Sequence, residues 1–349
     1  MRDATSPDLR LGYLVFEARR LQRWIDFCQR TLGLPAPLIN PDGSRGWQLD
    51  SQAQRLIVQE GPSDDVVALG LHCASEQVLE ALAARIRQAG LELEEGNPRQ
   101  CTARRVHRLV RTTDPAGNAV ELYVDPDEAE RPFASEAFPE GFRTGELGMG
   151  HAVLVSADLP AMEAFYEGVL GFGVTERLAT RVGPIDVRGT FMHCNARHHS
   201  IALFDLPLPK RMHHFMLQAA RLADIGIAFE RAERNKVPMS LGLGQHPDPD
   251  GTFSFYGATP SGFDFEIGAG THDIDPQGWQ VQHTQLTSSW GHKPRLRLQL
   301  NMARHLLVRK LFGRRKPQGR QAAGAAGVSA APGRHAQACS AARSAEVLR

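Results

Sequence analysis

A chain of 349 residues that is 42% hydrophobic can bury a sizeable core and should form about two domains, and no apolar run approaches the roughly 18 residues of a membrane span. The five cysteines are odd in number and include no CxxC pair, which argues against a disulfide framework and against a thiolate metal site. The net charge is +1. The N-terminal segment MRDATSPDLRLGY is polar and has no signal-peptide core, so we expect a cytoplasmic protein with no integral membrane segment.

The first half of the chain begins with a predicted strand and helix. The segment LGYLVFEARRLQRWIDFCQRTLGL, from Leu11, alternates like a strand and then carries apolar residues at helical spacing up to Gly33. A second strand and helix follow in VVALGLHCASEQVLEALAARIRQAG, from Val66. The half closes with a Pro-x-Gly turn that leads into a strand in DPAGNAVELYV, from Asp114. Each half should therefore hold two modules of a strand, a helix and further strands.

The second half repeats the first. MGHAVLVSADLPAMEAFYEGVLGF, from Met149, matches the opening segment at an offset of 138, and TPSGFDFEIGA, from Thr259, matches the closing strand at an offset of 145. HHFMLQAARLADIGIAFERAERNKV, from His213, supplies the middle strand and helix. An internal repeat of this kind constrains the fold more than composition does. It predicts an α+β protein made of two similar domains.

The domain boundary is predicted in the Pro- and acid-rich segment 125–142, which separates a first domain at 1–135 from a second at 145–294. Residues 295–349 form a basic tail, with twelve Lys and Arg against one acidic residue, so it carries +11 and the rest of the chain −10. The tail should begin with a helix, either packed on the body or resting on an anionic surface, and be disordered from Gln318 on. It has no aromatic platform or groove-reading motif, so we expect no nucleic-acid partner.

The two halves differ most where metal ligands could stand. Two histidines and a carboxylate of the second half align with strand positions at which the first half offers only the carboxylate: His151 over Tyr13, His214 over Ala68, and Glu266 over Glu121. A single histidine in a strand is more often structural, but this trio is a 2-His-1-carboxylate set, which holds one face of an octahedral iron(II) and leaves the other open. We predict a metal site in the second half.

Several motifs between about Leu11 and Pro294 carry a family resemblance: LGYLVFE, MGHAVL, HCNARHHS, HHFML, SFYGATPSGFDFEIG and SSWGHKP. They resemble the type I extradiol dioxygenases of the vicinal oxygen chelate superfamily, and most closely the 2,3-dihydroxybiphenyl 1,2-dioxygenase group. The resemblance implies four βαβββ modules paired into two glyoxalase-like domains, a metal-free first domain, and iron(II) in the second, with Mn(II) as the alternative.

The resemblance also implies an activity. It is extradiol (meta) cleavage of a bulky catechol such as 2,3-dihydroxybiphenyl by O₂, giving a 2-hydroxy-6-oxo-dienoate in the degradation of aromatic compounds, by a homo-oligomer. 1,2-Dihydroxynaphthalene and a steroid catechol are alternative substrates. A non-catalytic ligand-binding protein and a glyoxalase-type isomerase or lyase on the same scaffold are the rival functions.

Three further side chains are implied to take part in the chemistry. His199 matches a family histidine that moves protons, and a histidine titrates in the range this requires. Tyr256 and His246 match residues that contact ligated or substrate oxygens. The loop after His246 is one residue longer than the family pattern, and Asp248 stands where a small polar residue is usual, so we consider it a substitute contact to substrate.

The walls of the substrate site are predicted from strand faces. Val153 shares the face of His151 and should look into the site, and Phe191 precedes the His-His pair as an aromatic wall. Packing is the equal alternative for both. His198, on the opposite face from His199, should be structural or at the surface.

Overall fold

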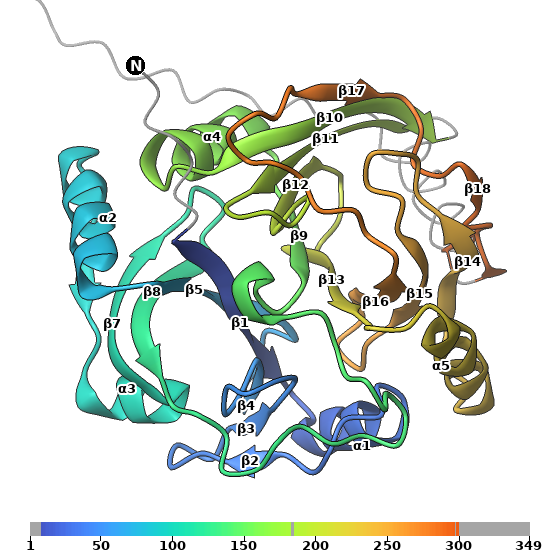
Figure 1. The fold of residues 1–349 in the computed structure, drawn as a ribbon, viewed down its shortest axis with the longest axis horizontal. Coiled ribbons are helices and arrows are strands. Elements are labelled where there is room, and N and C mark those ends of the chain that lie inside the picture. The colour runs from blue at the N-terminus through green and yellow to red at the C-terminus, as the bar shows by residue number, and fades with distance from the viewer. Residues whose placement is uncertain (1–7, 183–184, 297, 300–349) are drawn as a thin grey trace, which may run out of the picture. The chain divides into compact units, whose positions relative to one another are not determined.

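The computed structural model describes residues 8–182, 185–296, 298 and 299. The elements of the first half are β1 (Leu9–Ala18), α1 (Leu21–Arg30), β2 (Leu38–Ile39), β3 (Arg45–Trp47), β4 (Leu56–Glu60), β5 (Asp65–Cys73), α2 (Glu76–Gln88), β6 (Glu94–Glu95), α3 (Pro98–Arg104), β7 (Val106–Thr113) and β8 (Ala119–Pro126). They form two modules, each made of a strand, a helix and three strands, and α3 is an additional helix in the second module (Figure 1).

The second half repeats the order. Its elements are a 3₁₀ turn (Gly145–Leu147), β9 (His151–Val155), α4 (Leu159–Glu163), a π-helical continuation η2 (Ala164–Val169), β10 (Gly173–Val182), β11 (Ile185–His193), β12 (Ile201–Asp205), β13 (Met212–Gln218), α5 (Ala223–Arg234), β14 (Met239–Gln245), β15 (Phe253–Ala258), β16 (Asp264–Ala269), β17 (Gln282–Thr284) and β18 (Trp290–Gly291). The predicted four strand-helix-strands modules are therefore present.

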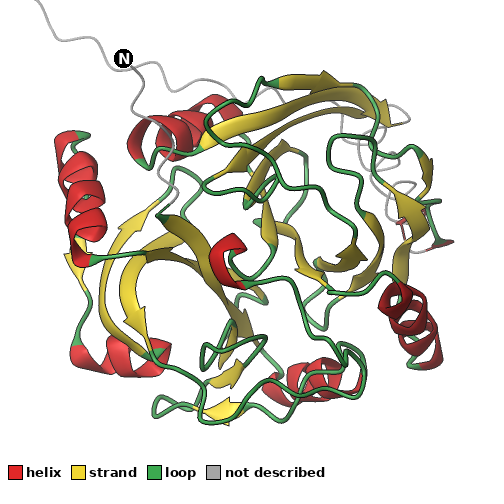
Figure 2. Ribbon diagram, in the orientation of Figure 1, coloured by secondary structure: helices red, strands yellow, loops and turns green. Residues whose placement is uncertain are grey.

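Each half forms one curved sheet, and the two sheets share a topology. The strand order is β2-β3-β4-β1-β5-β8-β7-β6 in the first sheet and β17-β10-β11-β12-β9-β13-β16-β15-β14-β18 in the second. In both sheets two modules join through an antiparallel pair, β1 with β5 or β9 with β13. The helices α1 to α5 lie outside the sheets (Figure 2). Strands β17 and β18 extend only the second sheet, one at each edge.

Polar caps start several of the helices. The Ser75 side chain accepts a hydrogen bond from the Val78 backbone at the beginning of α2, and Asp158 does the same for Ala161 at α4. Asn97 forms a capping box at α3. Such caps satisfy backbone donors that the first turn of a helix leaves free.

A shared aromatic core joins the two halves. Phe16 of β1 lies 5.3 Å from Phe215 of β13, ring centre to ring centre, and 5.0 Å from Phe263. Trp24 of α1 packs on Phe16 and donates its indole N–H to the Ser261 hydroxyl at 2.8 Å. The predicted division into domains at 1–135 and 145–294 stays a prediction, since the halves share this core.

The tail lies mostly outside the described residues. Residues 296, 298 and 299 are helical, while the predicted disorder from Gln318 on falls where the structure describes nothing. Arg295 contacts the body, with its guanidinium 5.7 Å from the centre of the Phe229 ring. Within the described ranges, every helix is too short or too polar to cross a bilayer.

A glycine fixes the start of β9. Gly150 has a φ of +140°, and a Cβ added there would lie 2.0 Å from the Met216 carbonyl oxygen of β13. Only glycine allows this approach of the two backbones. Because His151 is the next residue, the conformation of Gly150 also positions the backbone that carries the His151 imidazole.

We predict that Gly150→Ala lowers the free energy of unfolding by about 1–3 kcal/mol, since it combines an unfavourable φ with a backbone clash. Gly168 in η2 is the matched control, because an added Cβ there meets nothing within 4 Å. Gly168→Ala should leave stability unchanged or raise it by about 0.5–1 kcal/mol. Urea denaturation followed by circular dichroism measures both, and equal midpoints for Gly150→Ala and wild type would refute the constraint.

Candidate metal centre

The three predicted metal ligands lie on neighbouring strands of the second sheet. His151 begins β9, His214 lies in β13 and Glu266 lies in β16, with β13 between the other two strands. In the register, Met216 of β13 pairs with both His151 and Glu266. His214 precedes Met216 by two positions, so it lies on the same face. Strand alternation therefore turns the three side chains toward one point.

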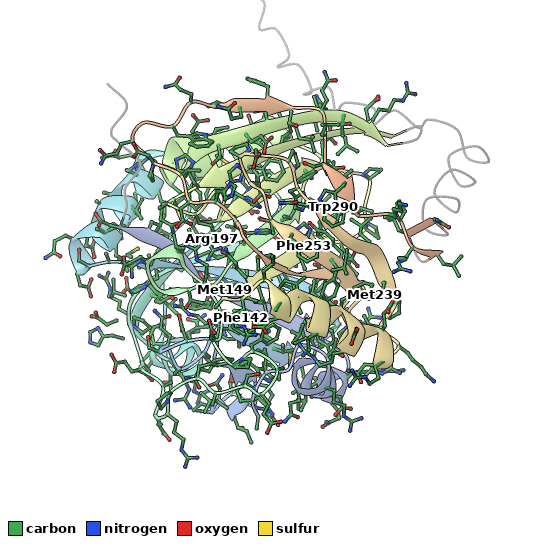
Figure 3. The ribbon with its side chains drawn as sticks, turned by 45° about the vertical axis from the view of Figure 1, so that its right-hand side comes forward. Phe142, Met149, Arg197, Met239, Phe253 and Trp290 are labelled. Carbon is green, nitrogen blue, oxygen red and sulfur yellow. The ribbon has the colours of Figure 1, made fainter. Side chains whose placement is uncertain are left out.

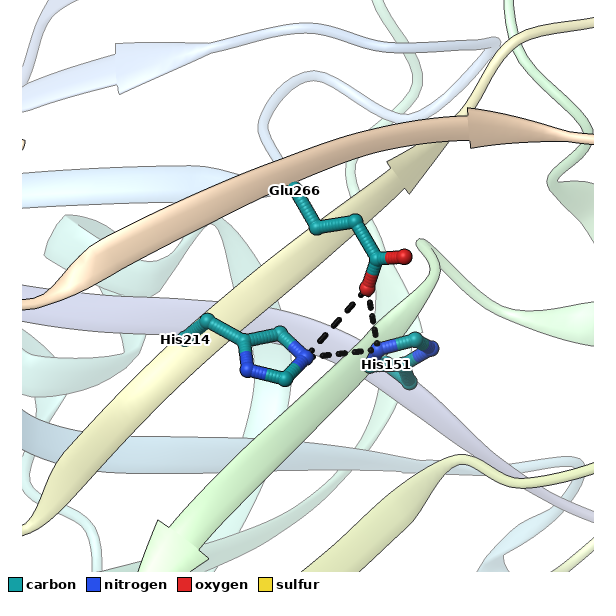
Figure 4. Close-up of side chains that lie close together, drawn as sticks. All are labelled: His151, His214 and Glu266. Carbon is teal, nitrogen blue, oxygen red and sulfur yellow. Dashed lines mark hydrogen bonds and ion pairs between the residues drawn. The ribbon is translucent and has the colours of Figure 1, made fainter. Parts of the chain in front are cut away.

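The ligand atoms of these residues are at metal-binding separations. The Nε2 atoms of His151 and His214 are 3.2 Å apart, and Oε2 of Glu266 lies 3.2 Å and 3.3 Å from them (Figure 4). Atoms that take adjacent positions on an octahedral ion, with bonds of about 2.1 Å, are about 3 Å apart. The trio thus has the spacing of one face of an octahedron.

The buried environment of the Glu266 carboxylate favours a bound cation. It is 1% exposed, and among the described residues neither of its oxygens meets a donor in hydrogen-bonding geometry. Burial alone would raise the pKa of Glu266, but the facing imidazoles of His151 and His214 hold that pKa well below its usual value. A buried anion without a partner is strongly destabilising, and a metal ion held by the same three residues would compensate it. The residues present therefore fit a divalent metal.

Tyr256 and His246 flank the carboxylate. Tyr256 of β15 pairs directly with Glu266, and its hydroxyl is 2.7 Å from Nε2 of His246. That Nε2 is 3.6 Å from Oε1 of Glu266. Burial lowers the pKa of His246, but Glu266 and the charge of Asp250 outweigh it and raise the pKa to about 9. The structure thus brings both predicted residues to the trio.

His199 lies over the first ligand. It comes from the loop between β11 and β12, and its ring centre is 4.1 Å from that of His151 and 4.9 Å from that of Phe191. Burial and then the neighbouring His151 lower the pKa of His199 well below its usual value, which favours the neutral imidazole. Val153 is buried on β9 and pairs with His214. The structure therefore brings Phe191 to His199 and Val153 to His214, and their role as walls of a substrate site stays a prediction.

A buried arginine holds the loop that carries His199. Arg197 is 2% exposed. Its Nε donates to the Leu147 carbonyl at 3.0 Å, and its Nη2 donates to the Arg143 carbonyl at 2.8 Å. Its Nη1 donates to the Gln218 side chain. A buried guanidinium keeps its charge and needs several acceptors, so it fixes the loop in place. No sequence pattern indicated this role, because the acceptors are distant in the chain.

Asp250, and not Asp248, points inward. The Asp248 side chain is 86% exposed and lies 3.7 Å from His272, so the structure does not bring it to the site. Asp250 is buried and forms a second group of possible ligands with His198 and His199. His198 is fully buried rather than at the surface, and its Nδ1 is 3.0 Å from that of His199. We interpret this group as support for His199. The spacing along the sequence did not reveal that Asp250, rather than Asp248, faces inward.

In the first half, an arginine occupies the position that corresponds to the predicted metal site. Gly70 of β5 pairs with both Tyr13 and Glu121, as Met216 does with its two partners. The Tyr13 hydroxyl donates to Glu121 at 2.6 Å, and Arg104 Nε donates to the same carboxylate at 2.9 Å. Here a guanidinium supplies the positive charge that the buried carboxylate requires. This supports the prediction that the first half holds no metal.

We predict that Arg104→Met destabilises the protein by about 3–5 kcal/mol, because it leaves Glu121 buried without a cation. The double variant Arg104→Met/Glu121→Gln removes both charges and should recover most of that loss. Thermal or urea unfolding measures the stability, and metal analysis of the same samples should show unchanged binding. Loss of metal in the double variant would contradict a metal-free first half.

A surface hollow of about 550 Å³ lies elsewhere, in the first half. Its lining includes Gly96, Cys101, Arg105 and His107. These residues do not form one of the groups of possible metal ligands found among the described residues. We therefore locate the chemistry at the trio on β9, β13 and β16.

Comparisons with known proteins identify the family of this chain. The family model described as Glyoxalase/Bleomycin resistance protein/Dioxygenase superfamily matches residues 148–267. The 3-methylcatechol 2,3-dioxygenase of Pseudomonas putida is 39% identical over 286 residues, 81% of this chain and 97% of that protein. The biphenyl-2,3-diol 1,2-dioxygenase of Paraburkholderia xenovorans is 38% identical, over 81% of this chain and 94% of that protein. An iron-dependent extradiol dioxygenase of Rhodococcus jostii is 32% identical, over 81% and 96%.

Solved structures lead to the same family. The crystal structure of BphC, a halotolerant catechol dioxygenase, superposes with a TM-score of 0.76 at 31% identity and covers 86% of this chain and 97% of that one. The chain therefore belongs to the extradiol dioxygenases of the glyoxalase, bleomycin resistance protein and dioxygenase superfamily. The predicted family, α+β fold class and enzyme class are confirmed.

Proposed function

We propose that this enzyme opens the ring of a bulky catechol beside one hydroxyl, using O₂ and an iron(II) held by His151, His214 and Glu266. The observation that carries the proposal is the buried Glu266 carboxylate, which faces two imidazole Nε2 atoms on adjacent strands and meets no donor among the described residues. A 2-His-1-carboxylate set with open positions is typical of non-haem iron(II) oxygenases. Mn(II) is the alternative, because the same nitrogen and oxygen ligands accept it.

When bound, iron(II) supplies open coordination positions and the redox chemistry for reaction with O₂. The protein supplies the proton transfers. His199, neutral at physiological pH and in contact with the His151 ring, can accept a proton from a catechol hydroxyl and later return it. The Tyr256 hydroxyl, at 2.7 Å from His246, can donate to a substrate oxygen near Glu266. The buried surroundings exclude bulk water from these transfers.

The substrate is proposed to be 2,3-dihydroxybiphenyl or a catechol of similar bulk. Relatives named for biphenyl-2,3-diol and for 3-methylcatechol are almost equally similar, at 38% and 39% identity. The Phe191 ring beside His199 suits an aromatic substituent, since offset or edge-to-face aromatic pairs add favourable energy. Assembly as a homo-oligomer remains part of this proposal, and sedimentation measures it directly.

We expect 2,3-dihydroxybiphenyl to be cleaved with a kcat/KM roughly ten- to a hundredfold above that of 3-methylcatechol. Burial of a second ring contributes about 1.5–3 kcal/mol, which corresponds to that ratio. The assay is anaerobic loading with Fe(II) or Mn(II), followed by initial rates with one-, two- and four-ring catechols and with 1,2-dihydroxynaphthalene. A preference for 3-methylcatechol would remove the bulky-substrate part of the proposal, and inactivity of the loaded enzyme on every catechol would remove the whole.

Metal ligand and proton carrier should separate on substitution. Glu266→Gln replaces an anionic ligand with a neutral amide, so both bound iron and rate should fall. His199→Asn leaves the trio intact, so iron content and catechol binding should survive while turnover falls by roughly 10²–10⁴-fold. Iron analysis, anaerobic catechol titration and stopped-flow absorbance give the three readouts. The assignment of His199 fails if its variant loses iron as Glu266→Gln does, or if it keeps full activity.

A further inference from the structure

The SSWGHKP segment near the end of the described chain is attached to β14. Strand β18 pairs with β14 at Gly291 and Gly244, and the His292 amide donates to the Leu243 carbonyl at 3.1 Å. A Cβ added at Gly244 would lie 2.2 Å from the His292 nitrogen, so the two backbones touch. The Trp290 ring stacks on Phe253 from the next strand at 5.8 Å (Figure 3). These contacts fix the segment beside the site.

Thr287, the residue that directly precedes this segment, bonds to His246. The Thr287 carbonyl is 2.7 Å from Nδ1 of His246. Because a carbonyl can only accept, Nδ1 carries a proton whether the imidazole is neutral or charged. This bond orients the ring so that the other nitrogen, Nε2, lies 2.7 Å from the Tyr256 hydroxyl and 3.6 Å from Glu266.

His292 packs against the same ring at a tilted angle. Its ring centre is 4.7 Å from that of His246 and 5.5 Å from that of Tyr256. The His292 ring is itself held at both nitrogens, with Nδ1 at 2.7 Å from the Ser288 hydroxyl and Nε2 at 3.2 Å from the Ser254 hydroxyl. It is 6% exposed, and the proposed reaction gives it no role.

We propose that Thr287–His292 is a clamp that holds His246 in its working orientation, with His292 as the positioning residue. The Thr287 carbonyl fixes the direction of Nδ1, and the pinned His292 ring prevents His246 from rotating away from Tyr256. The catalytic consequence rests on the proposed function, because His246 and Tyr256 address the substrate oxygen there. Misplacing a catalytic group lowers the reaction rate on the order of a hundredfold, so a positioning residue can contribute to the rate without contact to substrate.

The clamp is tested first without turnover. In the full-length metal-free protein labelled with [¹⁵N]histidine, the Nδ1–H of His246 should give an imidazole N–H signal protected from water exchange, assigned by its loss in His246→Gln. His292→Ala should broaden or abolish that signal while the circular dichroism spectrum stays that of wild type. Ser288→Ala, which removes one hydroxyl holding His292, is the milder variant should His292→Ala fold poorly. His283→Ala, an exposed histidine of β17, is the matched control and should leave the signal intact.

A double-mutant cycle then distinguishes positioning from general stabilisation. In the iron-loaded enzyme we expect His292→Ala to lower kcat/KM on the order of ten- to a hundredfold with unchanged iron content. In the His246→Gln background the same substitution should add less than about twofold, because residues that act through one another are not additive.

The outcomes separate the clamp from the function. A persistent His246 N–H signal in His292→Ala and in Ser288→Ala overturns the clamp, as does a full, additive loss of kcat/KM in the cycle. If the loaded wild type cleaves no catechol, the proposed function fails, yet loss of the protected signal in His292→Ala still supports the clamp.

Discussion

A carboxylate buried without a donor is the constraint on which the second half depends. Glu266 is buried on β16 and faces two imidazoles, one from the adjacent strand β13 and one from β9, the next strand along the sheet. An isolated buried charge is unfavourable by several kcal/mol, so a cation that shares the space would stabilise this part of the sheet. His199, Tyr256 and His246 lie around the same point.

The first half satisfies the same constraint by other means. Its carboxylate, Glu121, occupies the matching position in the same topology, but Arg104 and the Tyr13 hydroxyl bond to it directly. One half thus carries its positive charge in the chain, and for the other we propose that a metal supplies it. This difference also weighs against a glyoxalase-type function with ligands from both halves, because the first carboxylate is already engaged.

The sequence predicted what depends on strand periodicity and on the repeat. The convergence of His151, His214 and Glu266 follows from alternation on aligned strands, and the structure brings the three together. What the sequence could not predict depends on contacts between distant segments. Arg104 fills the first site from a helix that the repeat does not align, and the His292 ring reaches His246 only through the pairing of β18 with β14.

Side-chain directions in loops were the other feature that the sequence could not predict. The spacing after His246 suggested Asp248, but the turn directs Asp248 to solvent and Asp250 inward. His198 was expected to be structural or at the surface, and its burial beside His199 agrees with the first alternative and not with the second. Periodicity does not apply to such loops, so their side-chain directions follow from packing alone.

Anomalous diffraction at the iron edge, from crystals grown anaerobically with Fe(II), tests the central claim most directly. The account predicts one peak in the second half, about 2.0–2.3 Å from Nε2 of His151, Nε2 of His214 and a carboxylate oxygen of Glu266, and none beside Glu121. A peak held only by His198, His199 and Asp250, or the absence of any peak between the three strands, would contradict it.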